Sequence, residues 1–160
     1  MFLTIHGTAG TLIGQQTNNI WLAFILGFVF HFILDLIPHG DADLLTKQSE
    51  KYAFGQKTVD LLKKITAIDA LVMISLLAVF YWQGLITQPL PVLAGVTGSI
   101  LPDFIQGLYF LTKHPWLKKY FIFHSDIHFV SKKLLVSFWP GIGIQIVTLT
   151  ILISVLILLK

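Results

Sequence analysis

The sequence contains no cysteine and no arginine, and charged residues make up only 12% of its 160 positions. Because thiolates are missing, disulfides are excluded, and any bound metal would have to be held by imidazole and carboxylate groups. All basic side chains are lysines and the formal net charge is only +3, so we expect no nucleic-acid partner. The sequence also lacks a glycine-rich phosphate loop, a Ser, His and Asp order typical of nucleophilic hydrolases, and a heptad repeat.

Hydrophobic residues make up 55% of the chain and its mean hydropathy is +0.79, which is too apolar for an ordinary soluble domain. We therefore expect an all-α, polytopic membrane protein that forms a single integral membrane domain over residues 1–160. A short, half-buried N-terminal helix is expected over 2–14, and an amphipathic helix on the membrane surface within 39–65. Since about 20 apolar residues cross a bilayer, four transmembrane helices are predicted, over 20–37, 66–86, 91–112 and 134–159.

The placement of lysine predicts how the protein lies in its membrane. Ten of the eleven lysines fall in two segments, five in 39–65 and five in 113–133. By the positive-inside rule, both segments face the cytoplasm. If residues 2–14 fold back on the next helix about a turn at Asn18, the N-terminus is cytoplasmic as well and the C-terminus faces outward. We therefore expect a multi-pass protein of the inner (cell) membrane with its functional site toward the cytoplasm.

One stretch, residues 31–43 with the sequence HFILDLIPHGDAD, places ionisable groups at the end of an apolar run. Residues four apart on a helix share one face, so His31 and Asp35 are spaced to bind one ion. Pro38 disfavours continuation of the helix, which leaves a loop carrying His39, Asp41 and Asp43. The alternatives are that His31 and Asp35 form a neutral hydrogen-bonded pair and that the two loop aspartates are turn-forming residues.

Further histidines and aspartates are expected at the depth of this motif. At 1.5 Å per residue, His6, Asp69 and Asp103 lie about 18–28 Å from the outer turns, in the same layer as His31 and Asp35. The pair His124 and His128 follows on the cytoplasmic side, where it can close over the layer. An unpaired aspartate inside a membrane helix costs about 2.5–3.5 kcal/mol on insertion scales. Carboxylates without a hydrogen-bond partner or a bound ion are therefore unfavourable at this depth.

Each of these groups also has a purely structural interpretation. Asp69 can cap a helix near the interface, and Asp103 can cap a helix that is broken at Pro102. His124 and His128 belong to a basic, aromatic segment, which is also typical of a helix lying on the membrane surface.

The number of imidazoles and carboxylates at one depth exceeds the needs of a single catalytic zinc ion, which takes three protein ligands and a water. We therefore predict two or three zinc ions bridged by carboxylate; another divalent metal is also compatible. Such a site lowers the pKa of bound water to about 7 and stabilises negative charge on a phosphoryl oxygen. It suits hydrolysis of a substrate presented by membrane lipids, with Asp41 or Asp103 as general base. The candidate metal ligands are His6, His31, Asp35, His39, Asp69, Asp103, His124 and His128.

Three features carry a resemblance to known proteins: the string HxxxDxxPH over residues 31–39, His6-xxx-Gly10 before it, and Leu-Pro-Asp103 in a later helix. In these the chain resembles the bacterial and archaeal family of membrane-bound metal-dependent hydrolases, whose best-known members are LexA-regulated inner-membrane proteins. The string is also similar to the HxxxDxxxPxH motif of zinc-dependent phospholipase C and the related single-strand nucleases, which bind three zinc ions and cleave phosphodiesters. This resemblance implies His31, Asp35 and His39 as zinc ligands, although the spacing from proline to histidine is tighter here. The larger membrane members of this family carry a His-Arg-Gly-x-Thr-His segment. In this chain, the segment from His124 to His128 lies near the corresponding position but has no arginine.

The sequence thus predicts a membrane-embedded, zinc-type hydrolase that acts on a phosphoester of a lipid or lipid-linked substrate near the cytoplasmic face. Two other functions are open at this point. The same layer of histidine and aspartate can serve a metal or proton transporter, for which a water path would open to both faces. It can also hold a structural metal in a non-catalytic membrane scaffold, with a closed coordination shell.

Overall fold

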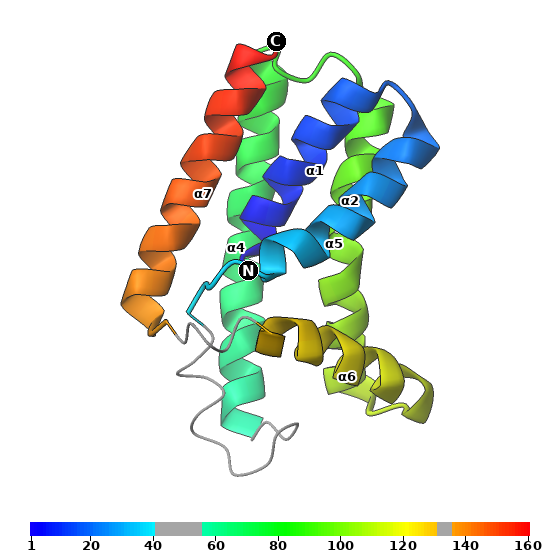
Figure 1. The fold of residues 1–160 in the computed structure, drawn as a ribbon, viewed down its shortest axis with the longest axis vertical. Helices are drawn as coiled ribbons and strands as arrows, with labels where there is room; N and C mark the ends of the chain where they lie inside the picture. The colour runs from blue at the N-terminus through cyan, green and yellow to red at the C-terminus, as the bar shows by residue number, and fades with distance from the viewer. Residues whose placement is uncertain (41–55, 131–135) are drawn as a thin grey trace.

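The fold is all-α, as the sequence predicts. It is taken from a computed structural model, which describes residues 1–40, 56–130 and 136–160; within these, the side chains of 56–59 and 128–130 lie outside the description. The described part contains six helices (Figure 1). They are α1 (Leu3–Thr17), α2 (Ile20–Asp35), α4 (Gln56–Trp82), α5 (Pro89–Thr112), α6 (Pro115–Val130) and α7 (Phe138–Leu158).

A tight turn joins α1 to α2, as predicted at Asn18. This residue ends α1 in the left-handed conformation, with φ of 49°, which asparagine adopts more readily than most residues. The next residue, Asn19, is the N-cap of α2, and its Oδ1 accepts a hydrogen bond of 3.0 Å from the amide of Leu22. The two helices therefore form a hairpin, which places the end of α2 near the start of α1.

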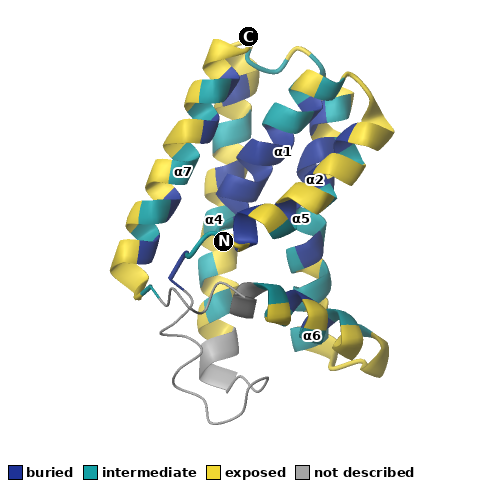
Figure 2. Cartoon of the chain, in the orientation of Figure 1, coloured by how far each residue is buried: buried dark blue, intermediate teal, exposed yellow. Residues whose placement is uncertain are grey.

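Glycines allow α1, α2 and α5 to pack with their backbones close together. A Cβ atom at Gly10 of α1 would lie 2.5 Å from the carbonyl oxygen of Gly95 of α5, and one at Gly98 would overlap the backbone of Phe24 in α2. Small residues are the usual means of such close approach between membrane helices. Figure 2 shows the consequence, since the buried residues concentrate on α1, at the centre of the bundle, while α4 and α7 are largely exposed.

Two helices of the described part are long and apolar enough to cross a membrane, rather than the four that the sequence predicts. They are residues Asp60–Trp82 of α4 and all of α7. The apolar helix α2 stops after 16 residues, because Pro38 follows shortly after its end. Helix α5 has 24 residues, but Pro102 and Asp103 interrupt its apolar sequence. By length and composition alone, the structure therefore supports two spans.

The segments predicted to face outward do lie at one end of the molecule (Figure 1). Gln15, near the end of α1, accepts hydrogen bonds of 3.1 and 3.3 Å from the amides of Thr87 and Gln88 in the loop before α5. At the same end, the Lys160 ammonium donates to the carbonyl of Gln83, at 3.0 Å. Helix α6, which carries two lysines of the second basic segment, lies toward the opposite end.

The two lysine-rich segments differ from their predicted forms. Much of 113–133, which is predicted from the sequence to be a loop, is helix α6. This helix starts at Pro115, and proline is favourable at the first position of a helix. The predicted surface helix within 39–65 falls mainly on residues outside the description. The last ten residues of that segment, from Gln56, belong to α4.

Candidate metal centre

The centre of the site is the pair that the helical spacing predicts, His31 and Asp35. Both side chains are fully buried, and His31 Nε2 lies 2.9 Å from Asp35 Oδ2, one turn along α2. A carboxylate buried in this way must be paired or bound to a cation, because removing an isolated charge from water is very unfavourable. The other groups around Asp35 therefore determine what the site can do.

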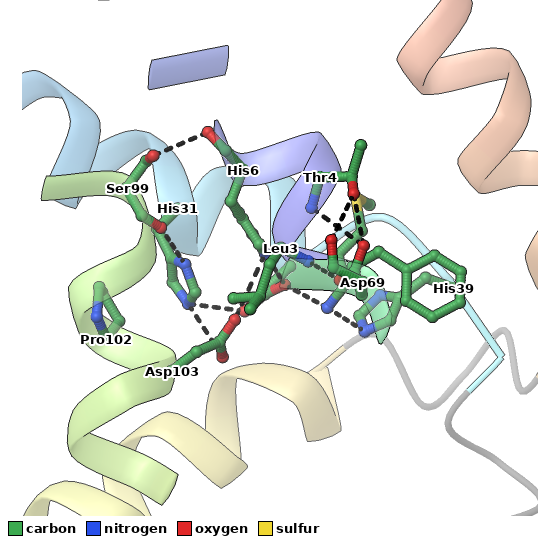
Figure 3. Close-up of polar contacts among 12 residues, drawn as sticks. Leu3, Thr4, His6, His31, His39, Asp69, Ser99, Pro102 and Asp103 are labelled. Atoms are coloured by element: carbon green, nitrogen blue, oxygen red, sulfur yellow. Dashed lines mark hydrogen bonds and ion pairs between the residues drawn. The ribbon is translucent and has the colours of Figure 1, made fainter. Parts of the chain in front are cut away.

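Two further helices bring Asp103 and His124 to the same place. His124 Nε2, on α6, lies 3.1 Å from His31 Nε2 and 3.3 Å from Asp35 Oδ2. Asp103 Oδ1, on α5, lies 3.8 Å from His31 Nε2 (Figure 3). The same oxygen lies 3.8 Å from His124 Nε2. All four potential ligand atoms lie within 4.8 Å of one another. This group, called the metal cluster below, consists of His31, Asp35, Asp103 and His124.

The distances within the metal cluster suit a tetrahedral ion. Zinc binds nitrogen and oxygen at about 2.0–2.1 Å, so that neighbouring ligands of a tetrahedral site lie about 3.3–3.4 Å apart. His31, Asp35 and His124 form a triangle with edges of 2.9, 3.1 and 3.3 Å. Asp103 lies slightly farther away, at 3.8 Å, and its side chain is 24% exposed where the other three are buried. Three tight ligands and one looser, accessible carboxylate therefore surround a common point.

A backbone carbonyl orients the His31 ring. The Ser99 carbonyl oxygen lies 2.8 Å from His31 Nδ1, and since a carbonyl can only accept, Nδ1 carries the hydrogen (Figure 3). A neutral ring then has its lone pair on Nε2, which faces the oxygen of Asp35. Two acceptors at 2.9 Å require a cation or a proton between them. The donor set thus fits a metal ion, and histidine ligands usually make such a second hydrogen bond to a carbonyl or carboxylate.

Pro102 lies in the turn of α5 that carries the Ser99 carbonyl. Pro102 has no amide hydrogen to donate to the carbonyl of Gly98, one turn earlier in the helix. The Ser99 carbonyl, in the same turn, accepts a hydrogen bond from His31 of α2. The serine hydroxyl donates to the carbonyl of His6, at 2.7 Å, and so connects α5 to α1.

His6 of α1 lies beside the metal cluster. Its Nε2 is 3.2 Å from Asp35 Oδ1 and 4.0 Å from Asp103 Oδ2, and its ring stacks on His31 with centroids 4.1 Å apart. Among the described residues, neither ring nitrogen of His6 has a hydrogen-bond partner of good geometry. Burial lowers the pKa of His6 to about 4, against the opposing effect of Asp35. His6 is therefore a neutral imidazole at pH 7, which is the form that binds metals.

The second oxygen of Asp35 faces a different group of residues. The Met1 amino group lies 2.9 Å from Asp35 Oδ1 and 2.9 Å from Nε2 of His39. His39 is buried, and its Nδ1 donates to the carbonyl of Ile37 at 2.6 Å. Gln145 of α7 holds this corner, because its Nε2 donates to the carbonyl of His39 and its Oε1 accepts from the amide of Phe2. Asp35 thus presents one oxygen to His31 and His124, and the other to His6 and the Met1 amino group.

Asp69 is the predicted ligand that lies elsewhere. Its carboxylate, on α4, accepts hydrogen bonds from the amides of Leu3 and Thr4 and from the Thr4 hydroxyl (Figure 3). The first amides of a helix have no partner within it and carry partial positive charge, which a carboxylate satisfies. The structural interpretation of Asp69 as a helix cap is therefore close to what is seen, except that the helix it caps is α1 rather than its own.

Tyr120 is a further polar residue beside the metal cluster. It precedes His124 by one turn of α6, and its hydroxyl donates to the carbonyl of Pro102, at 3.1 Å, next to Asp103. Burial, together with the charges of Asp103 and Asp35, raises the pKa of the Tyr120 hydroxyl, which therefore stays protonated as a donor. This hydrogen bond joins α6 to α5 where the two helices present their ligands.

The structure thus brings five predicted site residues together and places the others differently. His6, His31, Asp35, Asp103 and His124 meet, His39 adjoins them through Met1, and Asp69 caps α1. Asp41, Asp43 and the side chain of His128 lie outside the described residues. Three further polar residues adjoin the site without having been predicted from the sequence: Ser99, Tyr120 and Gln145. The first two precede Asp103 and His124 by four residues, a spacing that puts each on the same helix face as a predicted ligand.

No family model, curated protein or solved structure matches the chain.

Proposed function

We propose that the protein is a membrane-embedded, zinc-type hydrolase that acts on a phosphoester of a lipid or lipid-linked substrate. The observation that carries this proposal is the metal cluster, in which two imidazoles and two carboxylates from three helices converge within 4.8 Å. Three members are fully buried and the fourth, Asp103, is partly exposed. A catalytic zinc site needs this asymmetry, because three ligands must hold the ion while one side stays accessible.

The residues of the metal cluster have different roles in this proposal. His31, His124 and Asp35 hold the ion, because their ligand atoms form the tight triangle. A zinc ion there would act as a Lewis acid toward a phosphoryl oxygen and would activate a water at neutral pH. Asp103 lies at the accessible corner and takes the proton of the attacking water as general base. Ser99 and His6 adjoin the triangle, where Ser99 fixes the tautomer of His31 through its carbonyl.

A second ion, as the sequence predicts, would have to share Asp35. Its Oδ1 faces His6, at 3.2 Å, and the Met1 amino group, which in turn contacts His39. The positive charge of that amino group balances Asp35 at the position where a second cation would bind. His6 and His39 are therefore the residues that would complete a second site.

The lipid nature of the substrate is supported by the surroundings of the site. Two described helices have the length and composition of membrane spans, and α2, which carries His31 and Asp35, exposes several large apolar side chains. The lysine distribution favours a site toward the cytoplasmic side of the inner membrane. A phosphoester held at the membrane surface would thus meet the accessible Asp103.

Elemental analysis of detergent-purified protein tests the metal centre. We expect at least one zinc per chain in the wild type, and loss of it in the His31→Ala and Asp35→Ala variants, since each removes a buried ligand. His114→Ala is the matched control, because His114 is exposed in the turn between α5 and α6. A wild type that binds no zinc when zinc is supplied would refute the proposal.

The Asp103→Asn variant distinguishes the proposed enzyme from a scaffold with a structural metal. A general base can be removed without loss of the ion, so we expect the variant to keep its zinc and to lose hydrolysis of bis(p-nitrophenyl) phosphate. Loss of zinc from the Asp103→Asn variant, together with a wild type that shows no hydrolysis, would instead identify Asp103 as the fourth ligand of a closed, structural site. Zinc or proton flux in proteoliposomes, without hydrolysis, would favour the transporter.

A further inference from the structure

No described residue explains why position 107 of α5 is a glycine. It lies inside a helix, where glycine is less stable than alanine because its backbone loses more freedom on folding. Most glycines of the bundle are explained by close packing, since a Cβ atom would meet a neighbouring helix. At Gly107, by contrast, an added Cβ would have no heavy atom of the described residues within 4 Å. Open space adjoins the helix at this residue.

The open space lies between Asp103 and an apolar surface. At 100° per residue, Gly107 is rotated by about 40° from Asp103, away from Pro102, whose carbonyl accepts a hydrogen bond from Tyr120 of α6. Farther round the helix, at about 80–140°, follow three exposed apolar side chains. They are Phe104, Leu108 and Leu111, with exposed fractions of 58%, 48% and 65%. A path along the surface of α5 from these side chains to Asp103 therefore crosses Gly107.

We propose that Gly107 is the passage by which the phosphate headgroup of a membrane lipid reaches the metal centre. The hydrocarbon chain of that lipid lies along Phe104, Leu108 and Leu111. Asp103, the chain neighbour of Phe104, is the one member of the metal cluster that is partly exposed. Any side chain at 107 would stand between the apolar surface and this carboxylate. The inference rests on the proposed function, because it describes how the substrate of that site enters.

The chain contains a matched control in Gly143. It also lies inside a helix, α7, and an added Cβ there would likewise meet no described atom within 4 Å. Gly143 is exposed, and no member of the metal cluster lies on its helix. A leucine at either position therefore adds the same volume to a helix surface, but only at 107 does it stand beside Asp103.

The test is photolabelling of the full chain in nanodiscs with a phosphatidic acid that carries a diazirine near its glycerol. Labelled peptides are identified by mass spectrometry, and zinc content and the thermal midpoint are recorded for each variant. We expect Gly107→Leu to lower labelling of residues 103–111 by about tenfold. Gly143→Leu should leave it unchanged. Gly107→Met provides a second, more flexible obstruction if the leucine variant is poorly folded.

Unchanged labelling of 103–111 in both Gly107 variants overturns the inference, as does an equal loss in Gly143→Leu. Hydrolysis of bis(p-nitrophenyl) phosphate is measured in parallel and separates this inference from the proposed function. If the wild type hydrolyses the soluble diester but labelling does not depend on residue 107, the proposed hydrolase is supported and the proposed passage is refuted. If labelling depends on residue 107 but the wild type hydrolyses nothing, the passage stands as a lipid-binding path and the hydrolase proposal fails.

Discussion

His31 Nδ1 lies 2.8 Å from the carbonyl oxygen of Ser99, and this contact determines which nitrogen of the ring faces Asp35. With Nδ1 as donor, Nε2 points to Asp35 Oδ2 at 2.9 Å and to His124 Nε2 at 3.1 Å. The orientation does not depend on a side chain that could rotate, because the acceptor belongs to the backbone of α5. The packing of α5 against α2 therefore prepares the His31 ring as a ligand.

Close packing of these two helices should be sensitive to a single methyl group. A Cβ at Gly98 would overlap the backbone of Phe24, which cannot move aside as a flexible side chain would. We expect Gly98→Ala to lower the free energy of unfolding by about 1–3 kcal/mol, as overpacking usually does. Thermal unfolding in detergent measures the change. Gly143→Ala, where space is available, should be neutral or slightly stabilising, and an equal loss in both variants would contradict the packing argument.

Asp69 tests whether a predicted ligand is structural. Removal of the carboxylate in Asp69→Ala leaves the amides of Leu3 and Thr4 without their acceptor, so we expect a loss of about 1–2 kcal/mol in stability. The zinc content should stay at the wild-type level, because the carboxylate is engaged at the start of α1. Asp69→Asn keeps an acceptor oxygen and should lose less. Zinc analysis after purification decides the matter, and loss of zinc from Asp69→Asn would show that Asp69 is a ligand after all.

Tyr120 offers a test of the groups that support the ligands. Its hydroxyl joins α6 to the Pro102 carbonyl, so Tyr120→Phe should loosen His124 and Asp103 while leaving the ring in place. Loss of a supporting hydrogen bond of this kind lowers metal affinity by about 10–100-fold. Competition with a chelator measures the affinity, and the visible spectrum of the cobalt-substituted protein reports on the ligand geometry.

Tyr109→Phe is the control for this variant. Tyr109 stacks on Phe121, with centroids 4.6 Å apart, at the same contact between α5 and α6. Within the described part of the chain, its hydroxyl makes no hydrogen bond that holds a ligand, so the zinc affinity and the cobalt spectrum should not change. Similar losses in both variants would mean that any disturbance of this helix contact weakens the site.

The part of the site that the sequence predicts depends on local geometry. His31 and Asp35 are four residues apart on one helix, and Pro38 ends that helix soon after, so their relation follows from the helical repeat. His6 and Asp103 were placed at the same depth by counting from two turns. That count succeeded because the turn at Asn18 and the loop near Gln88 do lie at one end of the bundle.

What the sequence could not give depends on tertiary contacts. The acceptor of the His31 ring is a backbone carbonyl, which has no sequence signal of its own. Asp69 lies at the expected depth, yet its partners are the amides at the start of another helix, and composition cannot distinguish these from a metal. The four predicted spans were too many because length was inferred from apolar runs, while Pro38 shortens α2 and Pro102 and Asp103 interrupt α5.

The Gly107→Ala variant tests whether glycine at this position lowers stability while keeping the metal centre accessible. In the helix interior, glycine to alanine stabilises by about 0.5–1 kcal/mol where the added methyl group meets no obstacle. Gly107→Ala and Gly143→Ala should therefore both raise the thermal midpoint by a similar amount, because both positions have open space. Only the variant at 107 should slow hydrolysis of a lipid phosphoester, since only this position lies one helical turn from Asp103. A Gly107→Ala protein that is more stable and equally active on lipid would show that glycine is not needed there for access.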